Sequence, residues 1–183
     1  MSRWQRPIAA CSLVLAAAAL GGCGSSGGTK QVSAQAYASA LCTAVGPFER
    51  EIYTHAGALT DLGSVAPAAG KATLIQFLVG TAADSEHADL AMRGAGVPDV
   101  AEGKQISGAL VAMFSRLTSS LSAAESSAEA LPTTTESAFK TAAEALSDSV
   151  RTSVGDAGAG LQGLKSSALE HAANASPACH SLG

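Results

Sequence analysis

The sequence predicts an all-α protein: an up-down-up-down four-helix bundle with a kinked first helix and a short helix near the C-terminus. Three observations support this fold class. Residues that favour helices, chiefly Ala, Leu, Glu, Gln and Ser, dominate after residue 32, and no run of β-branched residues alternates as a strand would. Apolar residues recur at spacings of three and four over long segments. Proline and glycine fall between those segments, where helices are expected to end.

The first helix is predicted over residues 33–62. Its larger apolar residues lie near one helical face: Tyr37, Leu41, Val45, Phe48, Ile52 and Leu59. Proline lacks a backbone N–H, and its ring clashes with the preceding turn of a helix. We therefore expect a kink or a break at Gly46-Pro47.

The second helix is predicted to begin near Pro67, since proline suits the first turn of a helix. It should end at the helix-breaking residues Gly94, Gly96 and Pro98. Its predicted core-facing residues are Leu74, Ile75, Leu78, Ala82 and Leu90.

The third helix has the clearest pattern. Asp99 and Glu102 have the spacing of a capping pair, and Pro132 marks the end of the segment. The apolar residues between them form one stripe: Ile106, Leu110, Met113, Leu117, Leu121, Ala124, Ala128 and Leu131. Because Leu117 lies in the middle of this stripe, we expect its side chain to be buried.

The fourth helix is predicted to open at Thr133, with Glu136 completing a second capping pair. Its apolar stripe comprises Phe139, Ala143, Leu146, Val150, Val154, Ala157, Leu161 and Leu164. Leu146 lies mid-stripe and is expected to be buried. Ser167 and Glu170 predict a last short helix before Pro177.

The first 22 residues have the layout of an export signal. Arg3 and Arg6 precede an uncharged apolar run of 13 residues, 8–20, which is shorter than the roughly 20 residues that span a membrane. The run ends in Leu-Gly-Gly-Cys at 20–23, which resembles the lipobox of bacterial lipoproteins. This resemblance implies cleavage before Cys23, lipid attached to Cys23, and anchoring at the extracytoplasmic face of the cell membrane. The alternative is an ordinary export signal that leaves Cys23 as a plain thiol.

The predicted organisation is therefore a lipoprotein signal peptide (1–22), a lipidated cysteine with a flexible Gly/Ser tether (23–32), and a helical-bundle domain (33–183). Without Arg3 and Arg6, nine basic residues remain against fifteen acidic ones, so the formal charge changes from −4 to −6. An acidic chain with dispersed basic residues lacks the electrostatic footprint of a nucleic-acid-binding protein.

The remaining cysteines predict a disulfide. Cys11 leaves with the signal and Cys23 takes lipid, so Cys42 and Cys179 are the pair that remains. A disulfide is the usual state of such a pair outside the cytoplasm. An even number of long helices also returns the C-terminus to the end where the first helix began, near Cys42. Free thiols or a metal site are the alternatives.

Four local features carry a further resemblance. They are the Gly96–Val100 segment with Gly103, Cys42 after Tyr37-x-x-x-Leu41, the Pro-Thr turn before Phe139, and the closing Pro177–Cys179 segment. Together they resemble small alanine-rich helical lipoproteins of actinobacteria. The resemblance covers most of the chain after residue 22. It implies location and fold, and it implies no activity and no functional residue.

The search for catalytic or metal-binding patterns predicts no enzyme and no cofactor. No glutamate is followed by histidine three residues later, which excludes the ligand pattern of di-iron bundles. Asp84 and His87 share a helix face and would offer two ligands to a surface metal, but a solvated helix face is the preferred interpretation. The serines of segments such as 119–127 are interpreted as exposed helix surface rather than as nucleophiles.

Two functional hypotheses follow. The preferred one is a non-enzymatic, membrane-anchored interaction or structural module of the cell envelope, with an envelope protein as partner. The alternative is a carrier or sensor of an apolar small molecule or lipid, bound among Phe77, Met113, Phe114 and Phe139. An internal pocket of about 300 Å³ or more favours the carrier. A continuous exposed apolar patch without a pocket favours the module.

Overall fold

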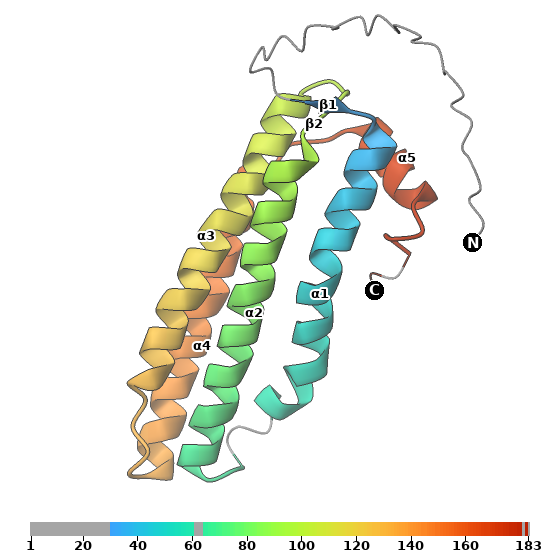
Figure 1. Cartoon of the computed structure of the whole chain (residues 1–183). Helices are drawn as coiled ribbons and strands as arrows, with labels where there is room; N and C mark the ends of the chain where they lie inside the picture. Colours follow the sequence, from blue (N-terminus) through green and yellow to red (C-terminus); the bar gives the residue numbers. More distant parts are fainter. Residues whose placement is uncertain (1–29, 61–63, 181, 183) are drawn as a thin grey trace, which may run out of the picture.

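The computed structural model describes residues 30–60, 64–180 and 182, without side chains at 56–60. Cys23, the export signal and the tether up to residue 29 lie outside the described residues. The described part is almost entirely helical (Figure 1), which confirms the all-α prediction. Its elements are β1 (Gln31–Val32), α1 (Ala34–Thr60), α2 (Pro67–Ala95), β2 (Val97–Pro98), α3 (Gly103–Glu129), α4 (Glu136–Gly158), the 3-10 helix η2 (Ala159–Leu161) and α5 (Ser167–Ala175).

A two-stranded parallel sheet joins the start of the described chain to the α2–α3 connection. Gln31 pairs with Val97, and Val32 pairs with Pro98. The backbone N–H of Val97 donates to the Lys30 carbonyl at 2.9 Å. The prediction of a chain without strands is therefore wrong in this one place. Strands of two residues are too short to show the period-2 pattern by which a sequence reveals them.

The long helices pack in the order of the chain. α2 packs against both α1 and α3, α4 packs mainly against α3, and α5 packs mainly against α1. α2 and α3 run in opposite directions. This is shown by Lys71, which lies in the first turns of α2 and donates to the carbonyls of Glu129 and Leu131 at the end of α3. A cation at this position also suits the negative end of the α3 dipole.

The hydrophobic core consists of two clusters along α2 and α3. The buried residues of the first cluster come mainly from α2, α3 and α4, and include Leu78, Leu117, Leu121, Phe139 and Leu146. Those of the second cluster come from α1, α2 and α3, and include Tyr37, Met92, Ile106, Leu110 and Phe114. α2 and α3 thus contribute to both clusters, whereas α1 and α4 complete different ones.

The predicted helix bounds are close to the observed ones, but the predicted caps are wrong. Glu102 precedes α3 in a left-handed conformation (φ 59°), and no side chain caps this end. At α4 the cap is Thr135 rather than Thr133, and its hydroxyl accepts from the N–H of Ala138. At α5 the cap is Ser166 rather than Ser167. Three threonines precede α4 and two serines stand at the start of α5, so the backbone conformation decides which one is the cap.

Other local expectations also need correction. α1 is continuous from Ala34 to Thr60 with Pro47 inside it, so the predicted alternative of a break is wrong. Three residues assigned to core stripes are exposed: Ile52, Leu90 and Val154. Periodicity identifies the apolar face of a helix. How much of that face is buried depends on which neighbouring helices cover it.

Candidate functional site

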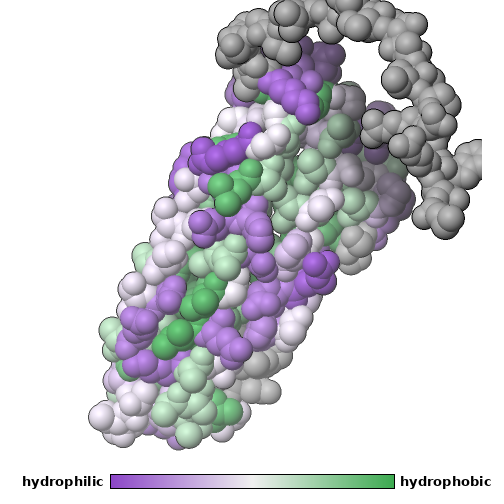
Figure 2. Space-filling view, in the orientation of Figure 1, coloured by the Kyte–Doolittle hydropathy of each residue, from purple (hydrophilic) through white to green (hydrophobic). Residues whose placement is uncertain are grey.

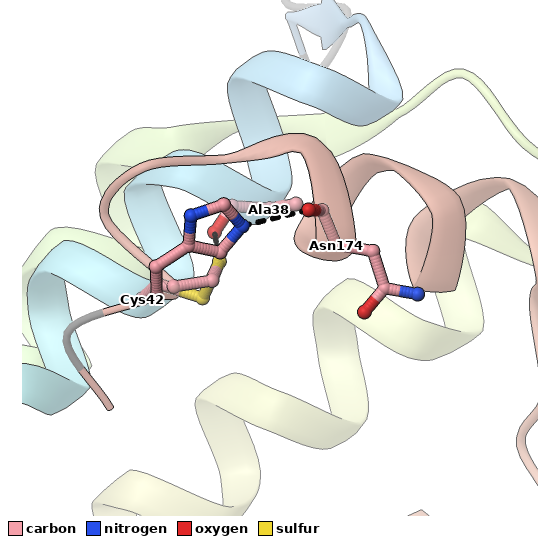
Figure 3. Close-up of a disulfide and its surroundings, with 5 residues drawn as sticks. Ala38, Cys42 and Asn174 are labelled. Atoms are coloured by element: carbon pink, nitrogen blue, oxygen red, sulfur yellow. Dashed lines mark hydrogen bonds between the residues drawn. A yellow bond between two sulfur atoms is a disulfide. The ribbon is translucent and has the colours of Figure 1, made fainter. Parts of the chain in front are cut away.

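The disulfide predicted from the cysteine count is present. Cys42 of α1 is bonded to Cys179, which follows α5, and their Cα atoms are 5.0 Å apart (Figure 3). The two residues are separated by 137 positions in sequence. Near them, Nε2 of His180 hydrogen-bonds to the Asn174 carbonyl at 2.8 Å, which closes the chain back onto the end of α5. The bond therefore fixes the C-terminal segment to α1.

Among the described residues, two buried hydroxyl groups make no hydrogen bond of full geometry, those of Tyr37 and Ser176. Burial raises the pKa of Tyr37 above its ordinary value, and the nearby Ser107 hydroxyl, which does not reach full hydrogen-bond geometry with Tyr37, lowers this pKa by less. Ser107 is itself engaged, since its hydroxyl donates to the Gly96 carbonyl at 3.0 Å. The folded protein therefore favours the neutral form of Tyr37.

The substitution Tyr37→Phe tests this arrangement. An unpartnered hydroxyl costs about 1–3 kcal/mol to bury, so we expect the variant to be at least as stable as the wild type at pH 7. Because the folded-state pKa is raised, the unfolded chain loses the Tyr37 proton first as the pH rises above about 10, and the wild type then loses stability that the variant keeps. Urea denaturation at pH 7 and pH 10.5 measures both effects.

Tyr53→Phe is the matched control, because Tyr53 is exposed on the same helix. This control should have no effect at either pH. The interpretation of Tyr37 as a buried, neutral and unpartnered hydroxyl would be contradicted by either of two results. One is that Tyr37→Phe is less stable than the wild type at pH 7, and the other is that it loses as much stability as the wild type between pH 7 and pH 10.5.

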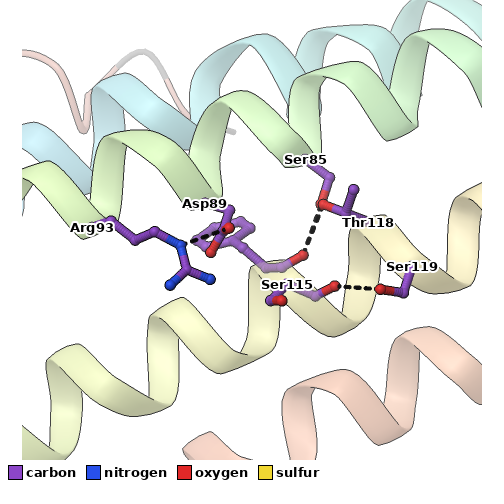
Figure 4. Close-up of polar contacts among 7 residues, drawn as sticks. Ser85, Asp89, Arg93, Ser115, Thr118 and Ser119 are labelled. Atoms are coloured by element: carbon purple, nitrogen blue, oxygen red, sulfur yellow. Dashed lines mark hydrogen bonds and ion pairs between the residues drawn. The ribbon is translucent and has the colours of Figure 1, made fainter.

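A small polar network joins α2 and α3 (Figure 4). The Thr118 hydroxyl donates to Ser85 Oγ at 3.1 Å, and Ser85 donates to the Phe114 carbonyl at 3.3 Å. One turn further along α2, Asp89 pairs with Arg93 at 2.9 Å. Buried hydroxyls that bond to each other and to the backbone fix the register of two helices at low cost, which indicates a structural role.

The acidic segment of α2, residues 84–89, holds no group of side chains that could bind a metal ion. In the part of the chain that the structure describes, no three His, Cys, Asp or Glu side chains are grouped so that they could hold a metal ion. Asp89, which belongs to this segment, pairs with Arg93 instead. The interpretation of Asp84 and His87 as part of a solvated face remains the preferred one.

A groove lined by hydroxyl groups runs between α3 and α4. It comprises two adjoining hollows of about 320 and 290 Å³. Arg116 and Asp156 lie at one end, and alanines and Val150 provide the apolar part of the lining. Six serines line it: Ser115, Ser119, Ser120 and Ser127 from α3, and Ser149 and Ser153 from α4. We call this feature the serine groove.

Two groove serines illustrate how the hydroxyls are arranged. Ser119 and Ser127 donate to backbone carbonyls one turn earlier in their own helix, at 3.0 and 2.9 Å. These donors are therefore used within α3, and the oxygen lone pairs are available to an incoming donor. The sequence interpretation treated this segment as plain exposed surface. The signal that it missed is the i, i+4 spacing of small polar residues on both helices, at 115 and 119 and at 149 and 153.

The residues proposed to line a carrier pocket are packed instead. Phe114 and Phe139 are 2% and 1% exposed and belong to the second and first core clusters. Phe77 and Met113 are half-buried and pack against the same clusters. None of the four lines the serine groove. The groove reaches the size expected of a ligand site, but it is open to solvent and rimmed by serine hydroxyls, unlike an enclosed pocket for an apolar ligand.

The exposed large hydrophobic residues are spread over several elements. They are Ile52, Tyr53, Val65, Val79, Leu90 and Val154. On the face shown in Figure 2, hydrophobic residues form separate spots among hydrophilic ones. Among the described helices, none combines the length and the apolar character that crossing a membrane requires.

Comparison with known proteins adds no relative: no family model, no curated protein and no solved structure matches this chain.

Proposed function

We propose that the chain is an extracytoplasmic lipoprotein, held to the cell membrane by lipid on Cys23, whose helical domain is a non-enzymatic interaction module. In this proposal α1–α4 act as one up-down-up-down four-helix unit that presents the serine groove to an envelope protein. The observation that carries the proposal is the contrast between a filled interior and an open, serine-lined groove on the outside. A module of this kind recognises its partner on its surface.

The chemistry of the serine groove favours a polypeptide partner. Serine and alanine side chains are short, so a partner backbone can approach α3 and α4 closely. The hydroxyl oxygens of Ser119 and Ser127, whose donors are used within α3, accept hydrogen bonds from peptide N–H groups. Arg116 and Asp156 offer one charge of each sign at one end, which would set the direction of a bound segment.

The position of the groove suits a membrane-anchored protein. The chain enters the fold at β1, which pairs with β2 just before α3. Ser115 and Ser127 follow Gly103 by 12 and 24 residues, which places the groove about 18 to 36 Å along α3 from that end. A partner would thus meet the groove away from the end where the tether enters.

The anchor and the groove are tested by separate arms of one experiment in cells of the native host. For the anchor, Cys23→Ser should abolish labelling with a radioactive fatty acid, because the thioether needs the cysteine sulfur. Labelling at the wild-type level would contradict the lipoprotein assignment.

For the groove, a photo-crosslinking residue replaces Ser119 in the lipidated protein, and the matched control carries it at Glu86, which is exposed on α2. We expect a discrete polypeptide adduct from position 119 that is absent from position 86. Adding Ser153→Trp, which fills the groove, should remove the adduct. Equal adducts from both positions, or an adduct that persists with Ser153→Trp, would contradict the role of the groove.

A further inference from the structure

The C-terminal strap, which we define as Ser166–His180, is attached to the fold chiefly through its disulfide. α5 packs mainly against α1. Ala172 is the buried apolar residue of α5, and Leu169 packs half-buried against the second core cluster. The loop before the strap contains Gly163, which has a φ of +83° and no neighbouring atoms at its Cβ position. Apolar packing alone therefore holds the strap weakly.

A buried polar group lowers the cost of releasing the strap further. Ser176 is fully buried, and its hydroxyl has no hydrogen-bond partner. Release of the strap would return this hydroxyl to water, where it regains its hydrogen bonds. The rest of the core would be changed little, because the buried residues of both core clusters come from elements that precede the strap.

The two cysteines differ in their exposure. Cys42 is buried at 8% exposure, whereas Cys179 is only half-buried. An incoming thiolate therefore reaches the sulfur of Cys179 more readily, and Cys42 departs as the thiolate. If the reductant is a dithiol, its second thiolate attacks the mixed disulfide and releases Cys179. The balance is one dithiol oxidised to a disulfide and one protein disulfide reduced to two thiols, with the two protons of the dithiol passed to Cys42 and Cys179.

We infer that the Cys42–Cys179 bond is a reversible redox latch, and that an extracytoplasmic dithiol reductant opens it to release the strap from α1 while α2 and α3 stay folded. Release uncovers the α1 surface near Ala38 and Cys42, since the Cys179 sulfur is bonded to Cys42 and lies 3.7 Å from the Ala38 carbonyl oxygen. The location of the reductant rests on the proposed function, but the latch itself does not require the lipid anchor.

Hydrogen–deuterium exchange of the purified mature chain, with and without dithiothreitol, tests the latch. We expect reduction to speed amide exchange in the strap by about tenfold or more, while α2 and α3 stay within about twofold, because local opening leaves the remaining cooperative unit protected. Tryptic cleavage after the exposed Lys165 should release the strap only from reduced protein.

The double variant Cys42→Ser with Cys179→Ser should show the reduced pattern without dithiothreitol and no response to it. If reduction leaves amide exchange in the strap unchanged, the latch is overturned, because packing alone would then hold the strap against α1. Faster exchange spread equally over α2 and α3 would also overturn it, because the bond would then stabilise the whole domain. These outcomes do not depend on Cys23 labelling or on Ser119 crosslinking, so the latch and the proposed function fail separately.

Discussion

Leu117→Ala is expected to lower the free energy of unfolding by about 2–5 kcal/mol, measured by urea denaturation. Leu117 is 6% exposed in the first core cluster, where it joins residues of α2 and α4. Truncating it removes apolar contacts and leaves a cavity that rigid helices fill only in part. The matched control is Leu90→Ala, because Leu90 is 59% exposed on α2 and its truncation should change stability by less than about 0.5 kcal/mol.

The same variant distinguishes the module from the carrier. A carrier of apolar ligands would contain a loosely filled interior, so the loss on truncation would be small, and a lipid ligand would raise the melting temperature with increasing concentration. We expect the large loss and no shift of the wild-type melting temperature with a panel of lipids. A small loss together with a clear shift would favour the carrier.

Gly103→Ala is expected to destabilise the fold by about 3 kcal/mol, at the upper end of the usual cost of overpacking. A Cβ atom at Gly103 would clash with the backbone carbonyl oxygen of Pro98, a contact that no side-chain rotation relieves. The start of α3 or strand β2 would have to move, and the β1–β2 pairing would weaken with it. Thermal unfolding and urea denaturation measure the loss.

Gly108→Ala is the matched control within the same helix. Nothing lies within 4 Å of the Cβ position of Gly108, so alanine there should stabilise α3 by about 0.5–1 kcal/mol through its higher helix propensity. If Gly103→Ala is as stable as Gly108→Ala, the inference that α3 packs too closely on Pro98 to admit a Cβ atom is wrong. If both destabilise, the argument from helix propensity fails.

The sequence predicted the helices well because their signals are local. Prolines and glycines placed the bounds of α2 and α3 within a few residues, and apolar spacing identified Leu117 and Leu146 as buried. Cysteine counting, together with an even number of long helices, predicted the bond between Cys42 and Cys179. Each of these inferences needs only the period of a helix or the redox chemistry of a compartment.

The serine groove and the helix caps could not be predicted, because they depend on how separate segments of the chain pack together. The serine groove exists because the small residues of α3 and α4 face each other across their interface, and a single-helix pattern does not distinguish that interface from solvent. The left-handed Glu102 and the cap at Thr135 likewise depend on the path of the backbone between elements.

The sequence by itself determined the helical class of this protein and its main core residues, because periodicity and composition act within one element. It also determined the cysteine pairing, because only two cysteines follow Cys23. The tertiary structure decided the β1–β2 pairing, the two-cluster core, the serine groove and the packing of α5 against α1. The physical reason is that these features arise from contacts between segments far apart in the chain. Their energies depend on the relative positions of whole helices, which no local pattern of residues specifies.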